Sequence, residues 1–515
     1  MKEKTYILAQ YDISGIQNYI FATNRLRENV GASINVGRIL KLFLPEAIKT
    51  VAGTEVTAIT DWELVENGEF LSESNPDILA EVLYIGGGNA VVVYRSRQLY
   101  DDVSKALAIK VAENCQGITV LSAFVETGLG EYSDKITELE EELSELKRRV
   151  PREVPMSPWP IVEQDPVYGL PVTRMYEKDG VSGSISEIQY EKYEASYRED
   201  TNENTSFRFA LQMEELIEKR GEDSYVAVVH IDGNGMGDMV HGIRNRHKDF
   251  KSAVPAMRKM SAAISQTYKE TFEGVVGDIS RSAGREVLPI RPLIMDGDDI
   301  TIICGARFAL PTVITFLRRL MDQASEELPV TACAGIAFVH SHFPFSIAYK
   351  IAEACCSEAK KSWYKNGAEQ KKTGYLDYQV VQGGYKKEKT VQRAESDIRK
   401  QPYRVSQKAD NSSDDSIDFL NLIQNQLVQE KNGMKIWPRN RLKKLYEAFL
   451  KGPQEVECIR REFSARGYEL SDLAAGMKSD EFNSARIYDA LELMDFYDKS
   501  LYDEFFRTEG QGGKA

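Results

Sequence analysis

The sequence has 515 residues, of which 42% are hydrophobic and 28% charged, a composition typical of a folded protein with several domains. Its net charge of -14 argues against a chain whose main task is to grip nucleic acid, so RNA is expected as an activator at most. No apolar run approaches the roughly twenty residues of a membrane span, and the six cysteines lack metal-ligand spacing. We therefore expect a cytoplasmic protein with reduced cysteines and no membrane partner.

The first region, residues 1–130, alternates strands and helices in an order typical of a ferredoxin-like α/β domain. One apolar strand runs into Asp12, and a later hairpin turns at Gly86-Gly87-Gly88-Asn89. That turn has no carboxylate, and Asp12 alone cannot hold two metal ions. Its glycines either let the backbone approach a nucleotide or form a tight turn, and the sequence leaves both interpretations open.

The second region, residues 131–222, is expected to be a helical segment between two α/β domains. Apolar side chains recur at spacings of three and four over residues 131–150, which predicts a helix packed inside the molecule. Prolines between residues 151 and 160 mark its end. A further helix is expected around residues 207–219, ahead of the next strand.

Two apolar runs of the third region, residues 223–385, meet carboxylates. The first leads into Asp232, and the second is interrupted by Asp296-Gly297-Asp298-Asp299, which predicts a β-hairpin. Aspartates at one tip repel each other unless positive charge lies between them. If these elements are neighbours, Asp232, Asp298 and Asp299 could hold two Mg²⁺ or Mn²⁺ ions, which activate a hydroxyl and stabilise a leaving pyrophosphate. The alternative is a set of solvated turn aspartates.

A glycine-rich turn follows the first of these carboxylates and opens onto the next predicted helix. Its backbone N–H groups could bind a triphosphate. A glycine-rich turn alone is weak evidence for such a site, and this one counts because it directly follows Asp232. With the hairpin glycine, the candidate nucleotide-binding residues here are Gly233, Asn234, Gly235, Met236, Gly237 and Gly297.

The last two regions carry no chemistry of their own. Residues 386–416 are polar, basic and rich in serine and aspartate, which predicts a flexible linker. Apolar residues such as Phe419, Leu420, Ile423 and Leu427 recur at helical spacing in residues 417–515. This pattern predicts a small C-terminal helical bundle that packs on a neighbouring domain or a partner.

The order of these motifs resembles the palm domains of nucleotidyl cyclases, in particular the large subunit of CRISPR type III effector complexes (the Csm/Cmr large-subunit family). The strand into Asp-Gly-Asn-Gly-Met-Gly and the hairpin with Gly-Asp-Asp match the catalytic palm, while residues 11–33 look like the opening of a first, non-catalytic palm. Residues 328–361 are also similar to the GGDEF diguanylate cyclases. The resemblance implies an α/β (α+β) fold with two ferredoxin-like palm domains, a helical inter-palm segment and a C-terminal helical bundle.

The same resemblance implies a palm-domain nucleotidyltransferase or cyclase that makes a cyclic or linear oligonucleotide signal from nucleoside triphosphate, with ATP and oligoadenylate favoured. The setting would be prokaryotic antiviral defence, with protein partners of a defence complex. Asp232, Asp298 and Asp299 would be the catalytic metal ligands. Lys360 matches the GGDEF lysine that contacts phosphate, although a cation at a helix C-terminus is favourable by itself. Candidate nucleotide-binding residues in the first palm are Ser14, Gly87 and Gly88.

Several departures from the family pattern favour a second hypothesis. Asp296 replaces the first glycine of Gly-Gly-Asp-Asp, so a third carboxylate crowds the tip, and Asn234 stands where many relatives have an aspartate. We expect no HD nuclease domain, and a four-cysteine zinc site is excluded between the palms because no cysteine lies between residues 115 and 304. The alternative is a catalytically inactive palm-fold scaffold or nucleotide-sensing subunit of a CRISPR-like complex.

Overall fold

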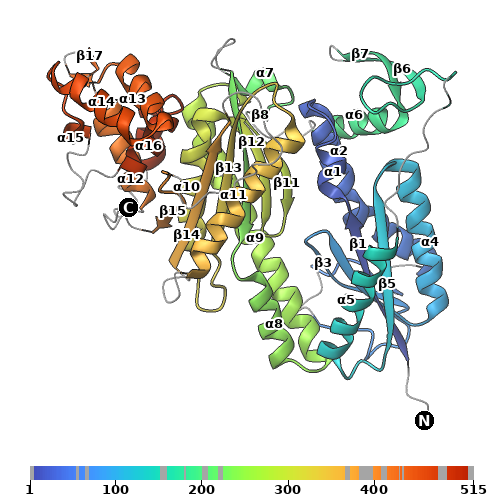
Figure 1. Ribbon diagram of the computed structural model, residues 1–515. Coiled ribbons are helices and arrows are strands. Elements are labelled where there is room, and N and C mark those ends of the chain that lie inside the picture. Colours follow the sequence, from blue (N-terminus) through green and yellow to red (C-terminus); the bar gives the residue numbers. More distant parts are fainter. Residues whose placement is uncertain are drawn as a thin grey trace.

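The computed structural model of the protein contains two α/β lobes, each built on its own sheet, and a helical bundle at the C-terminal end (Figure 1). These features confirm the predicted fold class of two ferredoxin-like units followed by a bundle. Within the described residues, no helix is both long and apolar enough to cross a membrane. The structure describes residues 5–53, 57–63, 69–150, 159, 161–178, 181–199, 207–217, 224–365, 372–381, 398–407, 415–428, 430–431, 434–435, 437–473 and 484–507.

The first palm is a five-stranded sheet in the order β2-β3-β4-β1-β5, and its last four strands have the order of a ferredoxin-like domain. Alternate residues of the central strand β1 point to opposite faces of the sheet. One face packs on helices α2 to α4 and the other on α5. The elements are β1 (Tyr6–Ser14), α1 (Ile16–Ile20), α2 (Leu26–Arg38), the π-helical turn η1 (Ile39–Phe43), α3 (Leu44–Ala52), β2 (Ala58–Ile59), β3 (Ala80–Gly86), β4 (Asn89–Tyr94), α4 (Arg97–Asn114) and β5 (Thr119–Thr127).

The inter-palm segment starts with the predicted helix, which buries Ile136, Leu139 and Leu143 against the first sheet. A hairpin and helix α6 follow, and α6 packs on α2. The predicted helix at residues 207–219 is wrong: the chain forms a short strand and a single helical turn there, fixed by the ion pair of Arg208 with Glu215 at 2.5 Å. The elements are α5 (Tyr132–Arg149), β6 (Val172–Lys178), β7 (Val181–Ser186), α6 (Glu187–Glu199), β8 (Arg208–Phe209) and α7 (Met213–Leu216).

The second palm is a six-stranded sheet in the order β11-β12-β9-β13-β14-β15. Its first four strands repeat the order of the first palm, which makes the two lobes a structural duplication. Helices α9 and α10 cover one face of this sheet, and α11 covers the other. The elements are β9 (Tyr225–Gly233), α8 (Met236–Arg246), α9 (Phe250–Ala283), β10 (Val287–Leu288), β11 (Ile290–Asp296), β12 (Asp299–Gly305), α10 (Ala306–Gln323), β13 (Ala332–His340), α11 (Phe345–Lys365), β14 (Thr373–Val380) and β15 (Tyr403–Ser406).

Strand β15 corrects the predicted linker. We expected residues 386–416 to be flexible, but Tyr403–Ser406 pair antiparallel with β14 at the edge of the second sheet. Tyr403 is fully buried and its hydroxyl donates to Asp489 at 2.9 Å, so a polar segment is held by its few buried residues. Residues 386–397 and 408–414 lie outside the described residues.

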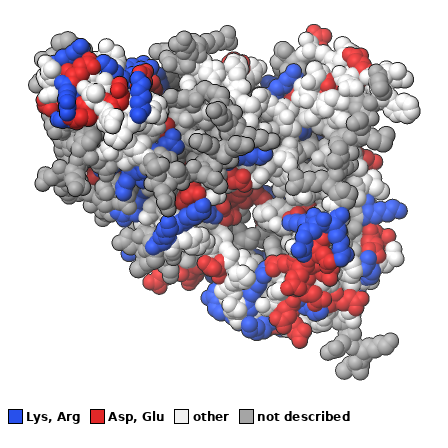
Figure 2. Space-filling view, in the orientation of Figure 1, with Lys and Arg blue, Asp and Glu red and all other residues white. Residues whose placement is uncertain are grey.

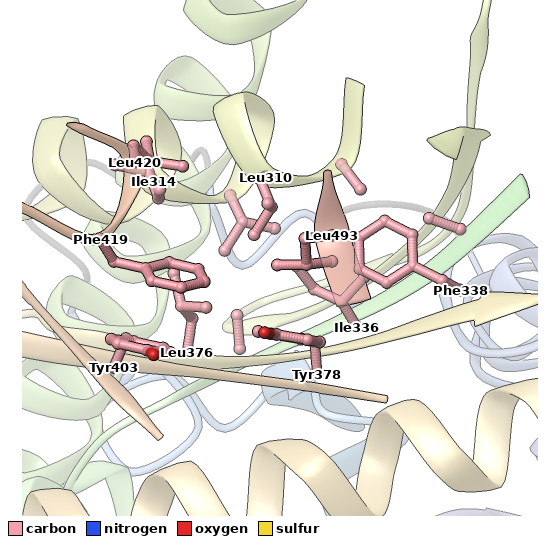
Figure 3. Packing of buried hydrophobic residues seen from close by; sticks show 14 of the residues in the cluster. Leu310, Ile314, Ile336, Phe338, Leu376, Tyr378, Tyr403, Phe419, Leu420 and Leu493 are labelled. Atoms are coloured by element: carbon pink, nitrogen blue, oxygen red, sulfur yellow. The ribbon is translucent and has the colours of Figure 1, made fainter. Parts of the chain in front are cut away.

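The C-terminal bundle continues the core of the second palm. Side chains from α10, the sheet, α12 and α16 interleave in one cluster, so the bundle is part of the palm's support (Figure 3). Labelled members are Leu310, Ile314, Ile336, Phe338, Leu376, Tyr378, Tyr403, Phe419, Leu420 and Leu493. The elements are α12 (Ser416–Leu422), the π-helical turn η4 (Ile423–Leu427), β16 (Glu430–Lys431), β17 (Met434–Lys435), α13 (Arg439–Lys451), α14 (Pro453–Ser464), α15 (Leu470–Leu473), α16 (Ser484–Leu493) and α17 (Lys499–Arg507).

A buried arginine joins the two palms. Arg258, which is 2% exposed, lies on the 34-residue helix α9 of the second palm and reaches strand β3 of the first. It donates to the carbonyl oxygens of Leu83 at 3.0 Å and Val82 at 2.7 Å, and pairs with Glu81 at 3.0 Å. Removing one partner of such a pair leaves a buried charge, so this contact holds the lobes firmly together.

Candidate active site

The two predicted carboxylate elements are neighbours in the second sheet. Strand β12 pairs antiparallel with β9, with Ile300 opposite Ile231, so the hairpin turn between β11 and β12 lies beside the end of β9. The approach is close: a Cβ on Gly233 would lie 2.6 Å from Oδ2 and 2.8 Å from Cβ of Asp298. The structure therefore brings Asp232 together with Asp298 and Asp299, and only glycine fits at position 233.

These carboxylates repel one another in a partly buried place. Burial and the charge of Asp232 raise the pKa of Asp298. The same two causes, with the neighbouring Asp298, raise the pKa of Asp299 to about 8. Oδ1 of Asp299 is buried and has no hydrogen-bond partner among the described residues. Such a group of carboxylates gains most from a cation placed among its oxygens.

Lys360 supplies the nearest cation to Asp232. It lies on α11, which covers this face of the sheet, and its Nζ is 2.6 Å from Oδ2 of Asp232. Nζ also donates to the carbonyl oxygen of Gly233 at 2.8 Å. Burial acts to lower the pKa of this lysine, but the carboxylate of Asp232 outweighs burial and raises the pKa above its usual value. Lys360 therefore stays charged and holds Asp232.

His230 is a site residue that the sequence analysis missed. It is two residues before Asp232 on β9, so both side chains point to the same face of the strand. Its Nδ1 lies 3.4 Å from Oδ1 of Asp299 and 3.3 Å from the hydroxyl of Thr301. Burial lowers the pKa of His230 to about 4, so the ring is neutral at pH 7. A histidine inside an otherwise apolar strand, spaced by two from a carboxylate, was the available signal.

The residues of the glycine-rich turn differ in what they do: some begin helix α8, and Asn234 is buried in the fold. Gly235 adopts a left-handed conformation (φ 67°) at the N-cap of α8, and Met236 begins that helix, so the first N–H groups of the helix have no partner within it. Asn234 points elsewhere: it is 4% exposed and its Nδ2 donates to Thr331 Oγ1 at 3.1 Å. The asparagine at the family's aspartate position is thus engaged in the fold.

The first palm meets this site at its own glycine turn. The amide of Gly88 donates to Oδ2 of Asp296 at 2.7 Å, so that N–H is engaged by a protein carboxylate. Gly87 precedes it in the turn, and Ser14 ends β1 opposite Thr119 in the first sheet. The carboxylate of Asp296 is engaged by the first palm, and its charge still contributes to the raised pKa values of Asp298 and Asp299, so a third carboxylate does crowd the hairpin tip as expected. On this face of the molecule, acidic side chains gather where the two lobes meet (Figure 2).

The donor set suits a divalent cation chemically, since carboxylate oxygens are the ligands that Mg²⁺ and Mn²⁺ prefer. The specific observation in favour of this fit is Oδ1 of Asp299, which is buried without a hydrogen bond and has the neutral ring of His230 3.4 Å away. Among the described residues, however, no three or more His, Cys, Asp or Glu side chains are arranged as a finished metal site. In this arrangement the carboxylate of Asp232 is paired with Lys360.

Comparisons with known proteins agree with this geometry. Residues 225–368 match the model for Cas10/Cmr2, second palm domain. No curated protein matches the sequence. The fold is similar to a crystal structure of Csm1 in T.onnurineus, at 14% identity and a TM-score of 0.53, over 96% of this chain and 70% of that chain. Crystal structures of a Csm1-Csm4 cassette with cA3 (TM-score 0.53) and with AMPPNP (TM-score 0.52) match at 13% identity over the same shares.

Proposed function

Because the chain carries the palm core of a type III CRISPR large subunit, we propose that its second palm is a nucleotidyltransferase or cyclase. It joins nucleoside triphosphates, with ATP favoured, into a linear or cyclic oligonucleotide. The observation that carries this proposal is the approach of Asp298 to Gly233, which places two hairpin carboxylates against the end of the strand that bears Asp232. A turn that needed only solvated aspartates would not require glycine beneath one of them.

Asp232, Asp298 and Asp299 would hold two Mg²⁺ or Mn²⁺ ions. When bound, these ions activate a ribose 3′-hydroxyl for attack on an α-phosphate and stabilise the leaving pyrophosphate. The P–O bond to the new ribose forms as the bond to pyrophosphate breaks, and the hydroxyl proton goes to solvent or a nearby base. The N–H groups at the start of the 11-residue helix α8 would bind triphosphate oxygens.

Lys360 has two anionic partners in this scheme. In the structure it neutralises Asp232. With metal and nucleotide present, Asp232 would exchange the ammonium group for a metal ion, and Lys360 would turn to a phosphate oxygen. In this exchange the carboxylate of Asp232 always has a positive partner, either the ammonium group or a metal ion. Such pairing matters here because burial and the neighbouring carboxylates already raise the pKa of Asp299.

The similar structures support the choice of ligand and partner. They contain a Csm1-Csm4 cassette with AMPPNP and with cA3. On that basis we propose ATP as the substrate, a cyclic or linear oligoadenylate as the product, and another protein subunit of a defence complex as the partner.

The test is incubation of the purified protein with Mg²⁺ or Mn²⁺ and each α-labelled nucleoside triphosphate, with and without RNA. The same series includes a double variant, Asp298→Ala with Asp299→Ala. Pyrophosphate release and a phosphatase-resistant product that disappears in the variant would establish the activity and name the base. An unchanged product in the variant would place the chemistry elsewhere.

A catalytically inactive scaffold or nucleotide-sensing subunit is the second candidate function. It is favoured by the ion pair of Lys360 with Asp232, which occupies one of the three candidate metal ligands. Nucleotide binding by calorimetry without any product, in all metals and with RNA, would select this candidate over the enzyme.

A further inference from the structure

Asp296 links the tips of two facing hairpins. Its Oδ2 accepts the amide of Gly88 from the β3–β4 turn at 2.7 Å, and its Oδ1 lies 3.6 Å from Nζ of Lys41 on η1. Both partners belong to the first palm, whereas Asp296 ends strand β11 of the second. We propose that Asp296 is an inter-palm positioning residue, which holds the carboxylate hairpin of the second palm in place by its contact with the first.

The contact is well placed to control the site. Asp296 and Asp299 face each other across the ends of β11 and β12, with only Gly297 and Asp298 between them. Fixing Asp296 therefore fixes the base of the turn that carries both candidate metal ligands. On the other side, the carbonyl of Gly88 accepts the amide of Ile13 at 3.1 Å, which ties the glycine turn to strand β1.

Asp296 differs from the candidate metal ligands because both of its carboxylate oxygens already have partners in the first palm. One oxygen accepts a backbone N–H and the other faces an ammonium group, while Asp299 has a buried oxygen with no hydrogen-bond partner among the described residues. A carboxylate that accepts a backbone N–H is held in a stronger bond than a neutral pair would give. Glycine, which the family pattern places here, has no side chain to make this contact.

Other contacts join the palms without involving Asp296. Gln17 of α1 donates to the hydroxyl of Tyr349 on α11 at 2.8 Å, and Arg258 joins α9 to β3. These contacts keep the lobes associated when Asp296 is removed. The expected effect of its loss is therefore that the two palms shift relative to one another about these contacts, while each palm keeps its fold.

The catalytic consequence rests on the proposed function, but the contact can be tested without it. The variants are Asp296→Ala, Asp296→Asn, which keeps an acceptor for Gly88 but loses the charge, and Lys41→Met. Spin labels at Lys105→Cys on α4 and Ser357→Cys on α11, both exposed, report the separation of the palms in a Cys458→Ser background. Mn²⁺ binding, thermal stability, and kcat and KM for ATP are measured on the same proteins.

We expect Asp296→Ala to broaden the distance distribution between the labels and to lower kcat about tenfold, as expected for a loss of orientation, with KM and the number of bound Mn²⁺ ions unchanged. Asp296→Asn should retain most of the contact, and Lys41→Met should have the smallest effect. An unchanged distance distribution in Asp296→Ala would overturn the proposal, and so would the loss of a Mn²⁺ ion, which would make Asp296 a ligand. If wild-type protein makes no product, the proposed function fails while the distances still decide the role of Asp296.

Discussion

Asp12 in the first palm and Asp232 in the second occupy the same place in their folds. Each lies three residues before a left-handed glycine that caps the following helix, Gly15 with φ 79° and Gly235 with φ 67°. Each also pairs with a lysine from the helix that follows the last strand of the ferredoxin-like order, α5 after β5 in the first palm and α11 after β13 in the second. Nζ of Lys147 is 2.7 Å from Asp12, and Nζ of Lys360 is 2.6 Å from Asp232.

The hairpins of the two palms repeat one another as well. In both, a bulge interrupts the pairing shortly before the turn, and the turn closes between residues that pair across it. Asp296 pairs with Asp299 in the second palm, and Gly86 with Asn89 in the first. The backbone was retained in both copies, while the side chains at the turn were not.

The residues beneath the turns differ in a complementary way. The second palm has Gly233 on its strand and Asp298 in the turn against it, with no room for a Cβ on the glycine. The first palm has Ile13 and Gly88 at the corresponding positions. A carboxylate in the turn and a glycine beneath it thus occur together in the second palm, and neither occurs at these positions in the first.

The largest effect is expected when the contact between Gly233 and Asp298 is disturbed. Gly233→Ala should lower product formation about 100-fold, because the added Cβ displaces Asp298 and a shift of about 1 Å at a catalytic group has that cost. The matched change in the first palm, Ile13→Val, should lower the free energy of unfolding by about 1 kcal/mol and leave product formation unchanged. Product formation by Gly233→Ala at the wild-type rate would contradict the comparison.

The two lysines give the next effect. Without nucleotide, Lys360→Met should bind Mn²⁺ about fivefold more tightly, because Asp232 loses a partly exposed ion pair of about 1 kcal/mol. Lys147→Met should leave the affinity for Mn²⁺ unchanged, since its partner Asp12 belongs to the palm without carboxylates in the turn. Calorimetric titration of both variants decides this, and equal changes in the two would remove the distinction between the palms.

A smaller effect concerns the pH dependence of stability. Burial raises the pKa of Asp12, although Lys147 acts in the opposite direction. A carboxyl with a raised pKa binds its proton more tightly in the folded chain, so the stability it contributes is greatest below the unfolded pKa of about 3.9 and is lost as the pH rises through the folded pKa. Urea unfolding from pH 4 to pH 7 should show a flatter pH dependence for Asp12→Asn than for wild type. A steeper dependence would show that the sign is wrong.

The smallest effect is an expected absence of change. Gly88→Asp and Asn89→Asp, introduced into the Asp298→Ala, Asp299→Ala protein, should restore no product. Gly88 has φ 72°, a conformation that strains aspartate, and Ile13 lies on the strand where the second palm has glycine. A labelled-nucleotide assay that detected restored product would show that the turn carboxylates alone are sufficient.

The sequence predicted correctly those elements whose residues carry a pattern within one short stretch of chain. The hairpin at residues 290–305 carries apolar runs and Asp-Gly turn chemistry, and helix α5 carries its apolar spacing. Asp232 was placed beside the turn because both elements end apolar runs. In the same way, the resemblance supplied the duplicated palms from the order of motifs.

The remaining features depend on contacts between residues far apart in the chain. The buried pair of Arg258 with Glu81 joins positions 177 residues apart, and no local pattern marks either one as buried. Tyr403 holds β15 in a stretch whose composition indicated a linker. Asp296 and Gly88 are 208 residues apart, and nothing in the sequence around either residue indicates that they form a hydrogen bond.

We propose that the carboxylates of the second palm hold two divalent metal ions. The most direct test of this proposal is to count Mn²⁺ ions by electron paramagnetic resonance in the presence of a non-hydrolysable ATP analogue. We predict two bound ions with mutual spin coupling in wild type and in Asn89→Ala, and their loss in Asp298→Ala with Asp299→Ala. Retention of both ions in that double variant would contradict the account.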